Sequence, residues 1–218
     1  MWGLTRHAYA VENRVSLPTS PLGVNLHMVN GLLAIFGLAT ATGLNAYFPL
    51  LTVGLLARYT DLIKLNPPYD LLSNPAVLVL IAVLALLDFV GDKIPVVDHA
   101  LHLVGLVVHP IAGAMVSLAA ENSASGTHPV LAAVCGLILA GGTHAARAAA
   151  RPVATVTTAG LGNPVVSLIE DIVSLILAVL AVLLPVLAFV LVVLIVGWTV
   201  RRILRFFRRR REPQPVPR

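Results

Sequence analysis

The chain has 218 residues, of which 58% are hydrophobic and only 11% are charged, and its formal net charge is +5 at pH 7. A soluble domain of this length carries about 25% charged residues, so the composition excludes an ordinary soluble enzyme domain and indicates a helical membrane protein. The single cysteine, Cys135, excludes an internal disulfide, and the positive charge gathers near the C-terminus, which does not favour nucleic acid as a partner.

Apolar runs of bilayer-spanning length recur along the chain and predict an all-α bundle of six transmembrane spans. The predicted spans are 31–58, 75–91, 95–120, 129–151, 164–183 and 185–208. The expected domain organisation is a flexible N-terminal extension at 1–29, a single transmembrane domain at 30–208 and a basic C-terminal tail at 209–218.

The first predicted span is long and is interrupted by Gly43, Asn45 and Pro49. Proline lacks the N–H that a helix interior needs, and glycine loosens the backbone. We therefore expect the first helix to be kinked or broken, with Asn45 and Tyr47 lining a pathway at the break.

A weak internal repeat divides the six spans into three plus three. Asn-Pro precedes an apolar segment in both 73–77 and 162–166, and 38–43 can be laid over 139–143. An odd number of spans per repeat forces the two copies into opposite orientations, as in many secondary transporters. The alternative is that Asn-Pro is simply a common helix start, because asparagine caps the helix N-terminus and proline suits the first turn. The two repeats would cover 31–120 and 129–208.

Lysine and arginine residues predict the orientation in the membrane. With six spans both termini share one side, which would also carry Lys93, Arg147 and Arg151, whereas Arg58 and Lys64 would lie on the other. The positive-inside rule then places both termini in the cytoplasm. The richness in Ala, Val and Arg is typical of a bacterial source, so we expect a multi-pass protein of the bacterial inner membrane.

An arginine cluster follows the last apolar run and includes Arg201, Arg202, Arg205 and Arg208. Such a cluster beside a membrane attracts anionic lipid headgroups. The expected partners are therefore the bilayer and its anionic lipids. We also expect either a homo-oligomer or a place in a larger membrane complex.

Three motifs together carry a family resemblance: GLNAYFPL at 43–50, GDKIPVVD at 91–98 and GLGNPVVSLIED at 160–171. With them the chain resembles an uncharacterised bacterial membrane family, a domain of unknown function similar to DUF4126. The resemblance covers about residues 31 to 190. It implies a small multi-pass membrane protein and brings no activity or substrate.

The third span carries Asp98, His102 and His109 on one face. Imidazoles and a carboxylate on one face suit a proton relay, and histidines that are hydrogen-bonded between helices are the alternative. Asp98 and His102 are weak candidates for a metal site. No metal is expected there, because His109 lies roughly 10 Å further along the helix axis than His102.

The fourth span ends with His144, Arg147 and Arg151 on one face, and Pro152 is expected to stop the helix. These arginines either face an anion, pair with carboxylates, or reach for the membrane surface.

The hydroxyl-rich and glycine-rich stretch 155–163 leads into a helix N-terminus, where Thr157, Thr158 and Asn163 could hold an anion. An ordinary capped loop is the alternative. The glycine spacing matches no nucleotide motif.

The fifth span carries one polar face, formed by Ser167, Glu170, Asp171 and Ser174. Acids close to the bilayer interior are expensive, and their nearest expected partners are Arg147 and Arg151. The face is either a structural ion-pair cluster or a place for a cation or a proton.

Asp88 and Asp92 lie one turn apart near the end of the second span and extend this set of candidate pathway residues. No nucleophile–base pair, HExxH or other catalytic signature is present, so neither an enzyme nor a cofactor is expected. We expect a small transporter or channel-like permease for a small ion or solute, with proton coupling. The alternatives are an accessory subunit of a membrane complex or a protein that handles lipid phosphates.

Overall fold

The computed structural model describes residues 26–92, 95–124, 128–158 and 162–211, and within these ranges it is helical and contains no strand. The prediction of an all-α fold is confirmed. The elements in chain order are α1 Leu26–Leu44, α2 Tyr47–Tyr59, the short 3-10 helix η1 Tyr69–Ser73, α3 Pro75–Gly91, α4 Pro95–Ala124, α5 Pro129–Thr158, α6 Asn163–Leu183 and α7 Pro185–Arg211.

Proline and asparagine set most of the helix starts. Helices α3, α4, α5 and α7 each begin at a proline, whose fixed φ suits the first turn and whose missing N–H is not needed there. The side chain of Asn74 accepts a hydrogen bond from the N–H of Ala76 at 2.9 Å and caps α3. For these reasons the predicted spans from 75 onward start within one residue of the observed helices.

Helix α5 is longer than predicted, because Pro152 lies inside it and does not end it. A single internal proline removes one backbone hydrogen bond, which a long helix can tolerate where neighbouring groups compensate. The hydroxyl of Thr155 donates to the carbonyl oxygen of Arg151 at 3.0 Å beside this point. Thr155 and Thr158 therefore belong to a helix and not to the predicted loop.

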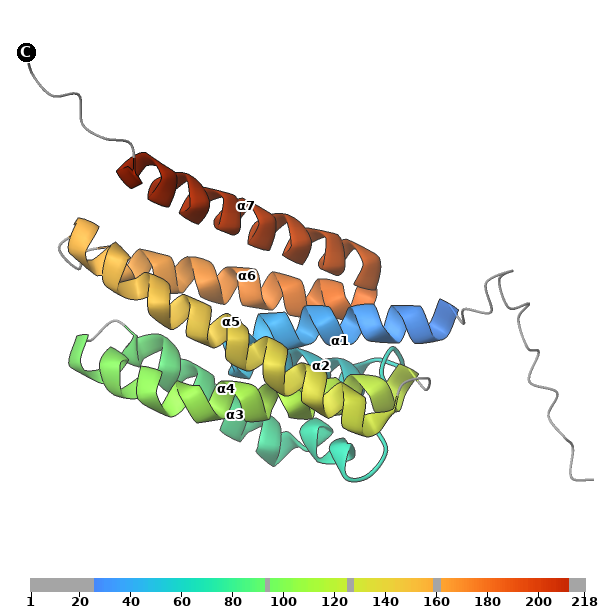
Figure 1. The fold of residues 1–218 in the computed structure, drawn as a ribbon. Helices are drawn as coiled ribbons and strands as arrows, with labels where there is room; N and C mark the ends of the chain where they lie inside the picture. Colours follow the sequence, from blue (N-terminus) through green and yellow to red (C-terminus); the bar gives the residue numbers. More distant parts are fainter. Residues whose placement is uncertain (1–25, 93–94, 125–127, 159–161, 212–218) are drawn as a thin grey trace, which may run out of the picture.

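Helices α1 and α2 form a hairpin with its tip at Asn45 (Figure 1). Asn45 contacts Asp88 near the end of α3, whereas Gly54 in α2 packs against Leu72 and Leu78 near the start of α3. Helix α2 therefore runs back, antiparallel to α3. The predicted break is present, but the count of six spans is not confirmed, since the chain reverses where a continuing span was expected.

The directions of the helices can be followed by colour in Figure 1. Helices α1, α3, α5 and α7 run toward one end of the bundle, and α2, α4 and α6 run away from it. We call this end, where α5 and α7 finish and α4 and α6 begin, the arginine end. Helix α1 begins at the opposite end, but the chain before Leu26 lies outside the described residues, so the placement of both ends of the chain on one side stays a prediction.

The predicted domain limits differ slightly from the helix limits. Helix α1 begins at Leu26, within the predicted extension, and α7 continues to Arg211, within the predicted tail. Residues 1–25 and 212–218 lie outside the described residues.

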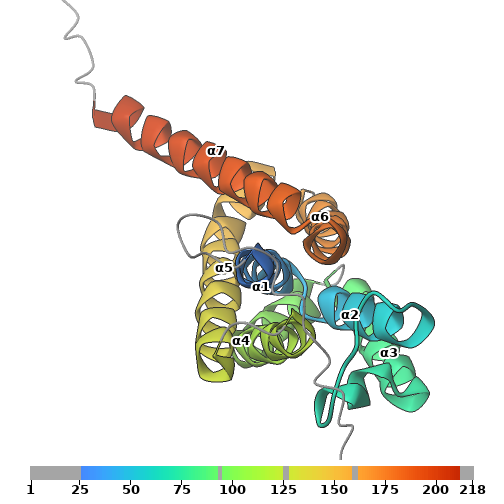
Figure 2. The same cartoon turned by 90° about the vertical axis from the view of Figure 1, so that its right-hand side faces the viewer.

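Small residues allow close packing around α1, which Figure 2 shows end-on among α4, α5 and α6. Gly43 of α1 packs against Thr143 and Ala140 of α5. Gly113 of α4 packs against Gly136, which also belongs to α5. Small side chains at such crossings let helix backbones approach closely, which is common between membrane helices.

The outer faces of the helices are apolar. Large exposed hydrophobic side chains include Leu86 on α3, Leu103 and Val107 on α4, and Ile169 and Ile176 on α6. Three helical segments, Ala100–Glu121, Pro129–Pro152 and Asn163–Leu183, are long and apolar enough to cross a membrane. A soluble bundle would turn polar faces outward, so these surfaces indicate a membrane protein.

Candidate functional site

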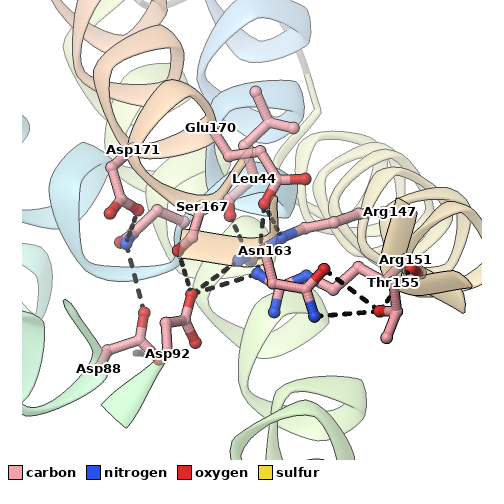
Figure 3. Close-up of polar contacts among 11 residues, drawn as sticks. Leu44, Asp88, Asp92, Arg147, Arg151, Thr155, Asn163, Ser167, Glu170 and Asp171 are labelled. Carbon is pink, nitrogen blue, oxygen red and sulfur yellow. Dashed lines mark hydrogen bonds and ion pairs between the residues drawn. The ribbon is translucent and has the colours of Figure 1, made fainter. Parts of the chain in front are cut away.

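The guanidinium of Arg147 joins three helices at the hairpin tip (Figure 3). Its Nε donates to Oε2 of Glu170 at 2.6 Å, its Nη2 to Oδ2 of Asp92 at 3.0 Å, and its Nη1 to the carbonyl oxygen of Leu44 at 2.7 Å. Leu44 ends α1, and the last carbonyls of a helix have no partner within the helix. Arg147 therefore pairs with two acids and also donates a hydrogen bond to a backbone carbonyl at the hairpin tip that has no partner within its helix.

Arg151 lies one turn further along α5 and shares the same two acids. Its Nη2 donates to Oδ2 of Asp92 at 3.2 Å and to Oε2 of Glu170 at 3.3 Å. The side chains of Arg147 and Asp92 are each 4% exposed, that of Arg151 is 7% exposed and that of Glu170 is 16% exposed. We call Asp92, Arg147, Arg151 and Glu170 the arginine network. The predicted pairing of the two acids of α6 with these arginines is confirmed for Glu170, whereas Asp171 accepts a hydrogen bond from Asn45.

Asp92 is held in its charged form. Burial raises the pKa of its carboxyl group, but a hydrogen bond from the hydroxyl of Ser167 and the guanidinium groups of Arg147 and Arg151 lower it, and together they hold the pKa below its usual value. Ser167 thereby takes part in the network through Asp92.

Asn45 links the hairpin tip to two further acids. Its amide nitrogen donates to Oδ1 of Asp171 at 2.9 Å and to Oδ2 of Asp88 at 3.3 Å. Its amide oxygen accepts from the N–H groups of Tyr47 at 2.9 Å and Phe48 at 3.2 Å and so caps the first turn of α2. Both donors and the acceptor of one buried amide are used, which fixes the tip against α3 and α6.

Acids outnumber bases among the described residues of this site. Two guanidinium groups face two carboxylates within the arginine network, and the amide of Asn45 brings two more carboxyl groups, Asp88 and Asp171. Asp171 is 4% exposed and Asn45 is fully buried. With every acid ionised the six groups carry two excess negative charges, and an excess of charge on buried and half-buried groups is best balanced by protons or by a cation.

Three histidines gather between α4 and α5. The rings of His109 and His144 stack with centroids 3.9 Å apart, and the rings of His102 and His144 meet edge to face at 5.7 Å. His144 thus lies with the histidines as well as on the face of Arg147, a grouping that the sequence did not predict. Among the residues whose side chains are described, no set of three metal-ligating groups is placed to hold an ion.

A cavity of about 420 Å³ opens at the arginine end, between α4, α5 and the start of α6. Apolar side chains form much of its wall, and Arg151, His102, Thr155 and Asn163 supply its polar part. Thr155 and Asn163 hydrogen-bond to each other at 3.0 Å. Arg151 connects this cavity directly to the arginine network.

Other predicted residues lie apart from these groups. Thr158 accepts a hydrogen bond from the N–H of Gly162 at 3.0 Å, just before the start of α6. Arg201 and Arg205 are exposed on α7, as an interaction with lipid headgroups requires. The side chains of Asp98, Thr157, Arg202 and Arg208 lie outside the described residues.

Sequence reasoning missed one contact of the hairpin tip. The carbonyl oxygen of Leu44 is a backbone group and has no signature in the sequence. Ser174, which the sequence places on the polar face of Ser167 and Asp171, donates its hydroxyl to the carbonyl oxygen of Ala41 at 2.9 Å and so also reaches the hairpin tip.

Comparison with known proteins gives one match. A family model described as a domain of unknown function (DUF4126) matches residues 32–205, while no curated protein and no solved structure matches. The matched range contains the hairpin tip, the arginine network and the three histidines.

Proposed function

The chain belongs to the family described as a domain of unknown function (DUF4126), and we propose that it is a small membrane transporter or channel-like permease that moves protons or another small cation. The observation that carries the proposal is the excess of acids, buried or half-buried, among the described residues at the hairpin tip, inside helices whose outer faces are apolar. Ionisable groups within a bilayer are costly, and in membrane proteins they commonly mark ion pathways.

The hairpin tip resembles the binding sites of secondary transporters in one physical respect. Helix α1 ends and α2 begins within the bundle, so free backbone carbonyls and N–H groups are presented beside charged side chains. Broken helices that present such groups are a common way to hold an ion near the middle of a membrane.

The proposed topology has five crossings, α3 to α7, and a re-entrant hairpin formed by α1 and α2. Arg151, Arg201 and Arg205 lie toward the arginine end, whereas Arg58 and Lys64 lie toward the other. The positive-inside rule places the arginine end in the cytoplasm of a bacterial inner membrane. The C-terminus is then cytoplasmic, and the start of α1 lies on the outer side.

The proposed inverted repeat fits α2–α4 against α5–α7, because each helix of one set runs opposite to its counterpart in the other (Figure 1). The alignment of 38–43 with 139–143 does not fit this relation, since α1 and α5 run in the same direction.

Cysteine labelling tests the topology. In a Cys135→Ser background, Asp61→Cys and Arg205→Cys each add one exposed thiol at opposite ends of the bundle. A membrane-impermeant maleimide is expected to label Asp61→Cys from outside intact cells and Arg205→Cys only in inverted vesicles. Labelling of both positions from the same side contradicts the five-crossing topology.

Proton flux into liposomes tests the function. Liposomes that contain the purified protein and a pH-sensitive dye are given a potassium diffusion potential, negative inside, with valinomycin. The parent protein is expected to acidify the lumen. Asp171→Asn keeps an acceptor for Asn45 but cannot ionise, and flux is expected to fall by at least about 100-fold.

The matched control is Asp70→Asn, which removes an exposed acid in η1 and is expected to leave flux unchanged. The same liposomes are also tested with gradients of sodium and potassium ions. A parent protein that moves none of these ions faster than protein-free liposomes contradicts the proposed function.

A second function, as an accessory subunit, is favoured by helix α7. Its large side chains at Leu194, Val196, Trp198 and Val200 are exposed, so this part of the helix is open to contact with lipid or with another protein. Native mass spectrometry of protein purified from its own membrane in mild detergent distinguishes the two functions. A stoichiometric second polypeptide would favour the accessory function.

A further inference from the structure

The three histidines at the α4–α5 interface are a candidate site separate from the arginine network. His109 and His144 are 5% and 1% exposed, and His102 lines the cavity at the arginine end. Because successive rings are in contact, the group extends from the cavity into the bundle. His102 and His109 lie seven positions apart on α4, which is about 10 Å of helix axis.

Hydrogen bonds fix the neutral forms of the two buried rings. Nδ1 of His109 lies 3.0 Å from the carbonyl oxygen of Gly105, and Nε2 of His144 lies 3.4 Å from that of His102. A carbonyl can only accept, so these nitrogens carry the protons. The opposite nitrogens, Nε2 of His109 and Nδ1 of His144, keep a free lone pair and have no hydrogen-bond partner among the described residues.

A buried nitrogen that lacks a partner is costly, and here two lie in adjacent stacked rings. A glycine makes the arrangement possible, since a Cβ at Gly105 would come within 2.6 Å of the His144 ring and 3.1 Å of Nδ1 of His109. The helices therefore hold both rings here, although apolar side chains in their place would leave no buried nitrogen without a hydrogen-bond partner.

We propose that His102, His144 and His109 form a proton path between the cavity and the buried middle of the bundle. The proposal rests on the proposed function and assigns the proton as the transported ion. A proton taken up at a free lone pair converts an imidazole to imidazolium, and its release to the next acceptor restores the neutral ring. No other reactant is consumed.

The surroundings of the path keep its protons transient. Arg147 and Arg151 face it from α5, and Asp92 faces it from the segment before α4. Helix α1, which packs on both α4 and α5, has no titratable side chain between 28 and 44. The rings of His109 and His144 are buried, and burial disfavours a lasting imidazolium. A mobile proton must be bound weakly at each ring, so that it can pass to the next one.

The liposome assay with the dye tests the path through two variants. His109→Leu removes the buried acceptor, and His102→Ala removes the ring at the cavity; each is expected to lower proton flux at least about 100-fold. Imidazole added at the cavity side is expected to restore flux in His102→Ala, which a purely structural role of His102 would not allow. His128→Asn, which changes an exposed histidine before α5, is the control and should match the parent.

The outcomes separate the two proposals. If the parent carries protons and Asp171→Asn does not, but His109→Leu and His102→Ala keep flux within about twofold of the parent, the path is overturned and the proposed function stands. A parent without proton flux overturns the path, and flux of sodium or potassium then leaves the function as a cation carrier. Gel filtration of each variant shows whether a loss of flux reflects misfolding, and in that case the imidazole rescue of His102→Ala decides.

Discussion

Replacing Arg147 with methionine is expected to destabilise the protein by about 3–5 kcal/mol, because it leaves buried acids without their shared partner. The guanidinium contacts Glu170, Asp92 and the carbonyl oxygen of Leu44, and methionine keeps the length of the side chain but none of these bonds. Arg151 reaches the same two acids at the longer distances of 3.2 and 3.3 Å. The measurement is the temperature at which detergent-purified protein loses its monodisperse gel-filtration peak.

Two further variants make this result specific. Arg147→Lys keeps the charge but cannot present three N–H groups in the fixed geometry of a guanidinium, so an intermediate loss is expected. Arg201→Met removes an exposed arginine from α7 and should leave stability nearly unchanged. Equal stability of Arg147→Met and the parent would mean that the network does not hold the hairpin tip.

The helix starts could be predicted because their causes are local. Pro75, Pro95 and Pro185 each mark a first turn, and the apolar runs behind them are long enough to fix the type of element. The reversal at Asn45 could not be predicted in the same way. Glycine, asparagine and proline indicate that a helix breaks, but the direction in which the chain continues depends on the distant partners of Asn45, Asp88 and Asp171.

Contacts of the candidate site were predictable where its members lie close together in the sequence, and not where they lie far apart. Glu170 and Arg147 lie on helices joined by a short connection, and their pairing followed from the shared polar faces. Asp92 precedes Arg147 by 55 positions, and only the fold brings them together. The stacking of His109 on His144 was equally inaccessible, because it depends on how closely α4 and α5 approach at Gly105.

The close approach of α4 and α5 leads to the second large effect. A side chain at Gly113 would place its Cβ 2.3 Å from the Cβ of Ala140 and 2.6 Å from the carbonyl oxygen of Gly136. One of these atoms belongs to the backbone, so the helices must move apart. Gly113→Leu is therefore expected to destabilise the protein by at least about 3 kcal/mol and to disturb the histidine path that the same interface holds.

Gly142→Leu is the matched control, because it makes the same substitution within α5 at an exposed position where an added Cβ meets nothing within 4 Å. Leucine forms helices better than glycine by nearly 1 kcal/mol and suits a surface that faces lipid, so this variant should be as stable as the parent or more so. Thermal unfolding of both variants in the same detergent measures the difference. If Gly113→Leu were as stable as Gly142→Leu, the α4–α5 contact would not be tight enough to hold two unpartnered imidazole nitrogens away from solvent. A loss of stability in Gly113→Leu but not in Gly142→Leu is expected instead. It would show that the small residues of this interface are needed to enclose the histidines.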